Sequence, residues 1–232
     1  MLAIERKNEI LDKLRTEQRV LVSDLAEYYN VTEETIRRDL DKLEKEGYAT
    51  KTYGGAILGN STKTDLSYTI RNKTNVEAKN VIASLASRLI EDGDHLMLDD
   101  SSTSLYLAKK LKDKKNLTVI TNSVELVVEL GSIDGWTILL TGGRLKPDSL
   151  ALVGDQTQQM LRHYHVDKVF MSCKGIDFDA GVTDSSEFHS QTKQSMLHCA
   201  RTKVLILDST KFDKVSFIDI APLDTFDTIV TN

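Results

Sequence analysis

The stretch VTEETIRRDLDKLEKEGY, from Val31 to Tyr48, specifies a helix with a marked beginning and end. Thr32 is a favourable N-cap, and the two glutamates that follow it lie where the helix dipole favours negative charge. Ile36, Leu40 and Leu43 recur at the spacing of one buried helical face. The sequence therefore predicts an amphipathic helix that begins after Thr32 and ends near the glycine before Tyr48.

Two adjacent arginines lie on this helix in a chain whose formal net charge is −5. At about 100° per residue, Arg38 points away from the apolar face. Arg37 and Thr35 lie on either side of the outward face that carries Arg38. An outward guanidinium suits the major groove, where it can bind guanine O6 and N7. We therefore predict that Arg38 contacts a base edge, that Thr35 contacts a base or a backbone oxygen, and that phosphates are bound by Arg37, Lys42 and Lys51.

The two arginines also allow a simpler interpretation. Each has an acidic residue four positions away, Glu34 and Asp41, so both could form ordinary solvated ion pairs. The surrounding sequence favours DNA, because a short helix with Ser23 as its expected N-cap precedes this one and two extended pieces around Thr52 to Gly55 follow it. Together these elements predict a winged helix-turn-helix.

The chain divides into parts of different character. Residues 1–57 form the predicted winged helix-turn-helix, and the polar residues 58–74 are expected to be a linker with a short ordered piece. Residues 75–232 alternate apolar strands with helices, which predicts an α/β domain with a mostly parallel sheet covered on both faces. A capping box from Thr74 to Glu77 is expected to start its first helix, whose apolar residues are Val81, Ile82, Leu85, Leu89 and Ile90. The expected fold class is thus α+β multidomain.

The composition excludes several classes of function. No apolar run approaches the ~20 residues of a membrane span, so no membrane partner is expected. The net acidity argues against an architectural protein that coats DNA, since such proteins carry a basic field. Two cysteines offer no disulfide framework, which makes the cytoplasm the expected compartment. No glycine-rich nucleotide motif occurs and His163 and His165 lack further ligands nearby, so neither a cofactor nor a metal is expected.

Residues 31–56, VTEETIRRDLDKLEKEGYATKTYGGA, resemble the signature of DeoR-family bacterial transcriptional regulators. The resemblance continues in the family's order through RNKTNVEAK, LDDSSTSLYLAKKL, LTVITNS, LLTGGRL, LVG, KGID and LDSTKF. It implies a second domain that senses a sugar phosphate, with a fold similar to ribose-phosphate isomerases and glucosamine-phosphate deaminases. It also implies a repressor of a sugar-metabolism operon. The chain departs from the family at Ser101, where glycine is common, and at the terminal DTIVTN, after which relatives usually continue.

Polar residues follow several predicted strands of the second domain, where parallel strands bring their carboxyl ends to one rim. LDDSSTS opens a helix after a strand, so free backbone N–H groups and the helix dipole favour an anion there. Lysines on this rim can neutralise a phosphate, and its aspartates and asparagine can bind sugar hydroxyls. The candidate effector residues are Asp99, Ser101, Ser102, Thr103, Thr121, Asn122, Gly142, Gly143, Lys174, Asp177, Glu187 and Lys211. A plain N-cap and a plain turn are the alternatives for the serine cluster and the glycine pair.

Two classes of function remain open at this point. The first is a regulator that binds double-stranded operator DNA under the control of a phosphorylated sugar. The second is a sugar-phosphate isomerase or deaminase fused to a DNA-binding module, in which Glu187, Asp177 and Lys193 would shuttle protons. Because their spacing identifies no acid–base pair, we expect no enzyme activity. One small DNA-binding unit covers few base pairs, so we expect a homodimer or higher homo-oligomer formed through the C-terminal domain.

Overall fold

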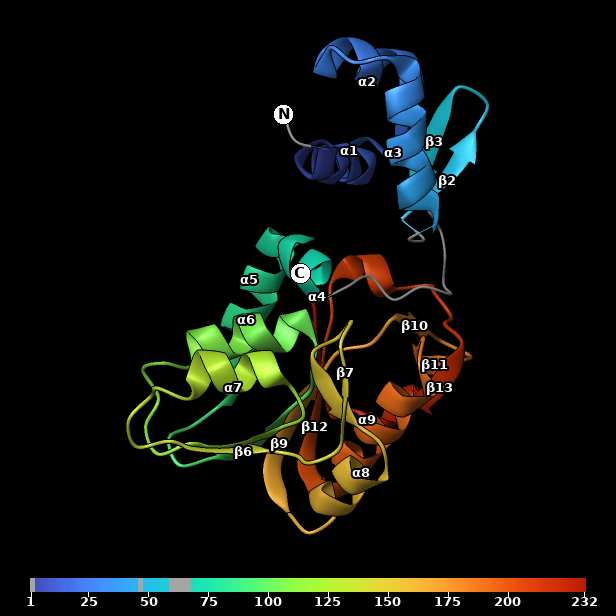
Figure 1. Ribbon diagram of the computed structural model, residues 1–232. Coiled ribbons are helices and arrows are strands. Elements are labelled where there is room, and N and C mark those ends of the chain that lie inside the picture. The colour runs from blue at the N-terminus through green and yellow to red at the C-terminus, as the bar shows by residue number, and fades with distance from the viewer. Residues whose placement is uncertain (1–2, 46–47, 59–67) are drawn as a thin grey trace. The chain divides into compact units, whose positions relative to one another are not determined.

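The computed structural model describes residues 3–45, 48–58 and 68–232 of the chain, which are drawn in colour in Figure 1. The chain separates into two compact units, Met1–Asp65 and Leu66–Asn232. Among the described residues, no helix combines the length and apolar character that crossing a lipid bilayer requires.

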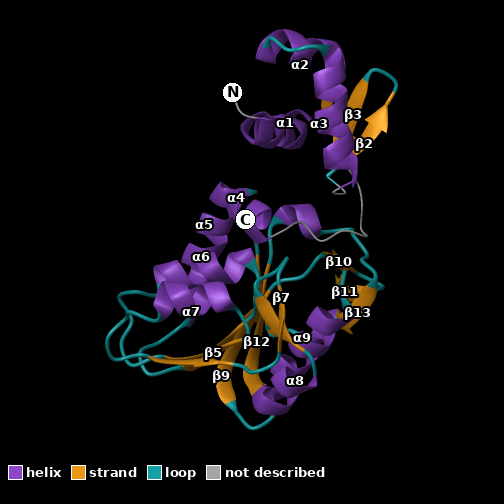
Figure 2. Cartoon of the chain, in the orientation of Figure 1, coloured by secondary structure: helices purple, strands orange, loops and turns teal. Residues whose placement is uncertain are grey.

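The first unit combines helices with a small antiparallel sheet (Figure 2). Its sheet has the strand order β1-β3-β2, and both pairs of neighbours are antiparallel. The predicted wing corresponds to β2 and β3, whereas β1 was not predicted. The elements are α1 (Ala3–Glu17), β1 (Arg19–Leu21), α2 (Val22–Tyr29), α3 (Glu33–Lys45), β2 (Ala49–Thr52) and β3 (Gly55–Leu58).

The predicted apolar face of α3 forms part of the core of this unit. Ile36 and Leu43 are fully buried and Leu40 is almost so. The N–H of Thr35 donates to Oγ1 of Thr32 across 3.3 Å, which confirms Thr32 as the cap of α3. The predicted end of the helix at residues 46–47 lies outside the described residues.

The predicted cap of α2 is wrong. The helix begins at Val22 with Leu21 in the N-cap position, so Ser23 lies in its first turn and donates to Oδ1 of Asp24 across 2.8 Å. The reason is the sheet: the N–H of Val22 donates to the carbonyl of Gly54 in the wing across 2.9 Å. The wing thus satisfies a helix donor that a serine cap was expected to serve.

The second unit is built on a six-stranded sheet with the order β14-β12-β9-β4-β5-β6. Every neighbouring pair in it is parallel, which confirms the predicted α/β architecture. The strands are β4 (His95–Leu98), β5 (Thr118–Thr121), β6 (Thr137–Leu140), β9 (Val166–Met171), β12 (Ala200–Ile206) and β14 (Thr228–Val230).

Helices cover both faces of this sheet (Figures 1 and 2). One apolar cluster joins Leu98 and Phe170 of the sheet to Ile82, and the other joins Met97 and Met171 to Met196. Alternate residues of the strands therefore supply the two cores. The helices are α4 (Tyr68–Lys73), α5 (Val76–Ala86), the 3-10 helix η1 (Ser87–Leu89), α6 (Ser102–Lys110), α7 (Val124–Leu130), α8 (Asp155–Leu161) and α9 (Glu187–Cys199).

Two small antiparallel sheets, β7-β8 and β10-β11-β13, were not predicted. Their strands have three or four residues each, too few to show an alternating pattern. The remaining elements are β7 (Arg144–Lys146), β8 (Ala151–Val153), β10 (Gly175–Asp177), β11 (Gly181–Asp184), β13 (Ile218–Ala221) and the 3-10 helices η2 (Ser209–Lys211) and η3 (Leu223–Thr225).

Two expectations for the start of the second unit need correction. Helix α4 lies within the segment expected to be a linker with a short ordered piece. The capping box does not form: α5 begins at Val76, and its N-cap, Asn75, has a left-handed φ of 52° and no side-chain cap hydrogen bond. Three of the five predicted apolar residues, Val81, Leu85 and Leu89, are exposed. The five residues span too wide an arc for one buried face, and the sheet covers only the arc that contains Ile82.

Candidate functional site

The two arginines of α3 are exposed on the first unit. The side chain of Arg38 is 74% exposed, with its Nε 3.4 Å from Oε1 of Glu34, and that of Arg37 is 51% exposed and binds Oε2 of Glu33 across 2.6 Å. The alternative pair between Arg37 and Asp41 is not formed. Among the described residues, both arginines thus pair with one solvent-exposed glutamate each on their own helix, which a DNA phosphate or base can replace at little cost.

Asp41 binds the wing instead of Arg37. Nζ of Lys51, in β2, contacts Oδ1 of Asp41, and the backbone N–H of Lys51 donates to Oε1 of Glu44 across 2.9 Å. The hydrogen bond with Asp41 raises the pKa of Lys51 and lowers that of Asp41. These contacts fix the wing beside α3, so Lys51 and the helix present one surface.

The other predicted DNA contacts lie on α3 itself. Thr35 is partly exposed, and its Oγ1 lies 2.9 Å from Oγ1 of Thr32. Lys42 is exposed two turns from the start of the helix. The surface formed by Thr35, Arg37, Arg38 and Lys42 of α3 with Lys51 of β2 is called the basic face below.

A buried ion pair behind the basic face was missed in the sequence. Nε of Arg6, in α1, lies 2.7 Å from Oδ2 of Asp39, and these side chains are only 9% and 3% exposed. Asp39 adjoins Leu40 on the buried side of α3. A carboxylate on that apolar face was the available indication that a buried cation would be needed.

In the second unit, Asp99 connects the ends of two strands of the large sheet. Its Oδ2 accepts the N–H of Ser172, just after β9, across 2.9 Å. Its Oδ1 accepts the hydroxyl of Ser104 across 2.6 Å and the N–H of Ser101 across 3.2 Å. With the side chain 1% exposed, Asp99 shapes the rim from within.

Lys193 of α9 lies against this carboxylate. Its Nζ donates to Oδ2 of Asp184 across 2.6 Å and to the carbonyl of Ser172 across 2.8 Å, and lies 3.6 Å from Oδ2 of Asp99. Burial lowers the pKa of Lys193, but the nearby aspartates raise it more, so that its pKa is above the usual range. The ammonium therefore stays charged at neutral pH, which does not suit the proton shuttle considered for it.

Asp100 continues the network towards β5. Its Oδ1 lies 3.3 Å from Nδ1 of His189 and 3.4 Å from Nδ2 of Asn122. Burial raises the pKa of Asp100, but His189, Lys193 and Arg71 outweigh burial and hold that pKa below its usual range. Oδ1 of Asn122 is buried and has no hydrogen-bond partner among the described residues.

A cluster of basic side chains lies beside Asp208, at the end of β12. Lys79 of α5 is 5% exposed, and its Nζ donates to the carbonyls of Arg71 and Thr74. Burial lowers the pKa of Lys79 to about 8; Asp208 opposes this shift, and Lys211 and Arg71 add to it. Nδ2 of Asn75 donates to Oδ1 of Asp208 across 3.2 Å. Arg71, Lys79 and Lys211 are called the basic cluster below.

The basic cluster adjoins the aspartate network. Arg71 acts on the pKa of both Lys79 and Asp100. Nε of Arg71 is buried without a hydrogen-bond partner among the described residues. The buried positive charge and the unpaired donor make this part of the rim suited to an anion.

The other predicted effector residues are distributed around the rim and beyond it. Ser101 caps α6, accepting the N–H of Ser104 across 3.0 Å, so the hydroxyl at the family's glycine position is used within the helix. Ser102 and Thr103 follow in the first turn, where N–H groups lack helical partners. Thr121 ends β5, and its Oγ1 accepts the N–H of Ser123 across 3.1 Å.

Five predicted residues fall on turns or on the surface. The carbonyl of Gly142 accepts the hydroxyl of Thr157 across 2.6 Å, and Gly143 has a φ of 126°. Asp177 closes the β10–β11 turn by accepting the N–H groups of Asp179 and Ala180. Glu187 is exposed at the start of α9. The N–H of Lys174 donates to the carbonyl of Thr183 across 3.0 Å.

Four residues at the rim were not predicted from the sequence: Arg71, Lys79, Asp184 and His189. Lys79 was detectable, because it shares the buried arc of α5 with Ile82, Ala83 and Ala86. A lysine on a buried helical face requires polar partners. The other three are brought to the rim by contacts between distant segments.

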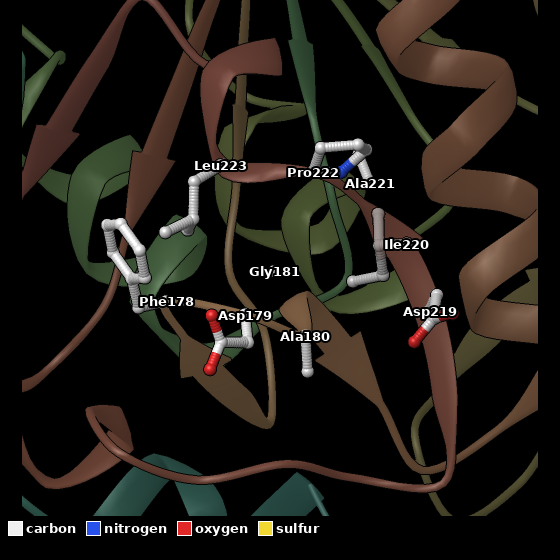
Figure 3. Close-up of a pocket in the computed structure, with 9 residues that line it drawn as sticks. All are labelled: Phe178, Asp179, Ala180, Gly181, Asp219, Ile220, Ala221, Pro222 and Leu223. Atoms are coloured by element: carbon white, nitrogen blue, oxygen red, sulfur yellow. The ribbon is translucent and has the colours of Figure 1, made fainter.

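A pocket of about 250 Å³ opens elsewhere in the second unit (Figure 3). It lies between the β10–β11 turn and β13, and contains none of the predicted site residues. Its lining is largely apolar: Phe178, Asp179, Ala180, Gly181, Asp219, Ile220, Ala221, Pro222 and Leu223.

Comparisons with known proteins agree with both units. A family model described as the DeoR-like helix-turn-helix domain matches residues 6–62, and the DeoR C terminal sensor domain matches residues 74–232. The HTH-type transcriptional regulator YulB of Bacillus subtilis is 38% identical over 100% of this chain and 90% of its own length. The transcriptional repressor GlcR of the same organism is 36% identical over 98% and 88% of the two chains. The L-fucose operon activator of Haemophilus influenzae is 31% identical over 98% and 91%.

Among solved structures, eIF2B delta of Chaetomium thermophilum matches with a TM-score of 0.50 and 14% identity, over 99% of this chain and 71% of that one. This likeness concerns the fold alone.

Proposed function

We propose that this chain, which belongs to the DeoR family of transcriptional regulators, represses a sugar-metabolism operon and releases its operator when a phosphorylated sugar binds the second unit. The names of two relatives bear on this proposal. GlcR is named as a transcriptional repressor, and the relative from Haemophilus influenzae is named as the activator of a sugar operon. A regulator of this kind acts in the cytoplasm.

The basic face of the first unit is the proposed contact with operator DNA. Arg38 is the more exposed of the two arginines and is assigned to a guanine edge, while Arg37, Lys42 and Lys51 are assigned to phosphates. Thr35 is assigned to a base or a backbone oxygen. The arginines are exposed, and so are the glutamates that pair with them. When DNA takes the place of these glutamates, no buried charge loses its partner, which supports these roles.

One observation supports the proposed binding site for a phosphorylated sugar. Arg71, Lys79 and Lys211 come from three separate elements to one part of the rim, and Nε of Arg71 is buried there without a hydrogen-bond partner among the described residues. A phosphate would accept from this donor and neutralise the cluster. The N-terminus of α6, from Ser101 to Thr103, supplies further donors.

Sugar hydroxyls need neutral or acidic partners beside the phosphate. Oδ1 of Asn122, which no described residue binds, can accept a hydroxyl proton, and Asp100 lies 3.4 Å from the amide of the same side chain. Asp99, Thr121, Gly142, Gly143, Lys174, Asp177 and Glu187 complete the proposed effector set around these residues. We propose binding without turnover, since the raised pKa of Lys193 does not suit proton transfer.

Control by a ligand requires linkage between the two units. The phosphorylated sugar must bind the DNA-free arrangement more tightly than the DNA-bound one, and the ratio of these affinities sets the loss of operator affinity. Two copies of the chain would bind half-sites about 34 Å, or one helical turn, apart. We therefore propose a homo-oligomer assembled through the second unit.

Calorimetry with pentose and hexose phosphates and their parent sugars tests the ligand half. At least one phosphate should bind saturably, while its parent sugar should bind at least tenfold more weakly. Lys79→Ala and Lys211→Ala should abolish this binding, and Lys110→Ala, at an exposed lysine of α6, should not alter it. Equally tight binding of a parent sugar and its phosphorylated form would contradict the proposed phosphate site. Conversion of the sugar phosphate during the titration would favour the alternative function, a sugar-phosphate isomerase or deaminase.

A further inference from the structure

The outer face of α5 and η1 carries an apolar strip that the described residues of the second unit leave uncovered. Val81, Leu85 and Leu89 are 49%, 40% and 38% exposed, whereas Ile82 and Ala83 behind them are fully buried. A helix on the surface of a monomer normally shows solvent a polar face. These three residues, spaced four apart, are called the α5 strip below.

Opposite charges lie at the two ends of the α5 strip. Glu77 lies one turn before Val81, Arg88 lies between Leu85 and Leu89, and both are exposed. Within the described part of the chain, neither forms an ion pair. The strip is therefore apolar in its centre, acidic at its start and basic at its end.

This pattern is complementary to itself in one orientation. Two copies of α5 placed antiparallel about a two-fold axis that crosses the outer face at the level of Ala83 bring Val81 of each copy to Leu85 of the other. The same placement sets Glu77 of each copy opposite Leu89 of the other, one residue from Arg88. A parallel placement would set Glu77 against Glu77 and Arg88 against Arg88, which like charges oppose. A two-fold interface of this kind uses the same patch on both copies.

We propose that the α5 strip is the interface through which two copies of this chain form an antiparallel, two-fold homodimer. The proposal rests on the proposed function only for the need to bind two half-sites, because the apolar centre and the paired charges are features of α5 and η1 themselves. A second copy is the occupant that satisfies both charged ends at once.

The position of α5 gives this interface a role in regulation. Its outer face carries the strip, and its inner face carries Lys79 of the basic cluster, one turn from Ala83. Its N-cap, Asn75, binds Asp208 at the same part of the rim. A ligand that repositions α5 from inside would therefore alter the contact between the two copies.

Sedimentation of the full chain at micromolar concentration tests the interface. The unmodified chain should be a dimer, and Leu85→Glu should raise the dimer dissociation constant at least tenfold, because it places two carboxylates in the apolar centre. Val128→Glu is the matched control, since Val128 is 75% exposed on α7 and should leave the dimer intact. An unmodified chain that sediments as a monomer, or a Leu85→Glu dimer as tight as the control, would overturn the proposal.

Exchanging the charges tests the orientation. Glu77→Arg or Arg88→Glu alone should weaken the dimer, and the two together should restore it, since each copy then again opposes unlike charges. A double variant weaker than both single variants would overturn the antiparallel arrangement. A mixed dimer with another protein would also fail this test, because it does not require both ends to complement themselves.

Ligand binding separates this inference from the proposed function. Leu85→Glu should bind the phosphorylated sugar as the monomer and lose affinity for a two-half-site operator. If no phosphorylated sugar binds but the dimer still depends on Leu85 and on the charge pair, the ligand proposal fails and the interface stands.

Discussion

Arg6 of α1 and Asp39 of α3 form an ion pair of 2.7 Å that is almost completely buried in the first unit. Asp39 is adjacent to Arg38, the residue assigned to a base edge. The pair therefore fixes the rotation of α3 against α1, and with it the direction in which Arg38 points.

Arg6→Ala should destabilise the first unit by about 3–5 kcal/mol, because it leaves Asp39 charged and buried without a partner. Replacing both residues together, as Arg6→Met with Asp39→Leu, should cost far less, since apolar side chains then fill the space. Denaturant unfolding of the three proteins measures this difference. A single variant that loses less than about 1 kcal/mol would mean that the pair does not hold α3 in place.

Arg38→Ala should cost about 1–3 kcal/mol of operator binding and relax the base preference at one position. Arg37→Ala should weaken binding to all sequences alike and reduce the salt slope by about one unit, as expected of a phosphate contact. Binding measured against selected and random duplexes over a range of salt separates the two roles. Equal loss of specificity in both variants would contradict the assignment.

Affinity for the phosphorylated sugar should fall as the pH rises above about 8. Burial gives Lys79 a pKa of about 8 in the free protein, and a bound phosphate favours its charged form and so raises that pKa. Between the free and the bound pKa, binding takes up a proton, and the affinity falls by up to about tenfold per pH unit. Calorimetry from pH 7.5 to 9.5, in buffers of different ionisation enthalpy, detects this uptake. Constant affinity across this range would exclude Lys79 from the site.

Lys193→Met should destabilise the second unit by about 3–5 kcal/mol, because Asp184 and Asp99 lose the buried cation they share. Lys193 outweighs burial and lowers the pKa of Asp184, so this carboxyl contributes stability above its unfolded pKa and loses it as the pH falls through the folded pKa. The variant should therefore show its deficit at neutral pH and converge with the parent chain in acid. Unfolding curves at pH 7 and pH 3 test this, and an equal deficit at both would contradict it.

Local patterns were enough to predict much of this fold. Thr32 caps α3 as predicted, as such residues do near the start of an apolar pattern. The buried face of α3 and the parallel strands of the second unit also follow from apolar spacing within each segment. These features depend on neighbours in the sequence.

Features that depend on distant segments were not predicted. Which of the apolar residues of α5 face the core is decided by the sheet, and the sequence alone did not separate Ile82 from Val81. The partners of Lys79 and Lys193 come from other elements, so their roles required the folded chain. The predicted N-cap role of Ser23 was wrong for the same reason, because the first N–H of its helix is bound by the wing, a distant segment of the chain.

The measurement that tests the central claim most directly is operator release followed by fluorescence anisotropy. An operator duplex selected from random DNA would be bound by the full chain and titrated with the phosphorylated sugar that calorimetry identifies. The account predicts saturable release by this ligand, no release by its parent sugar, and a Lys211→Ala variant that binds DNA normally but is not released. Release by the parent sugar at equal concentration, or normal release of Lys211→Ala, would contradict control through the phosphate site.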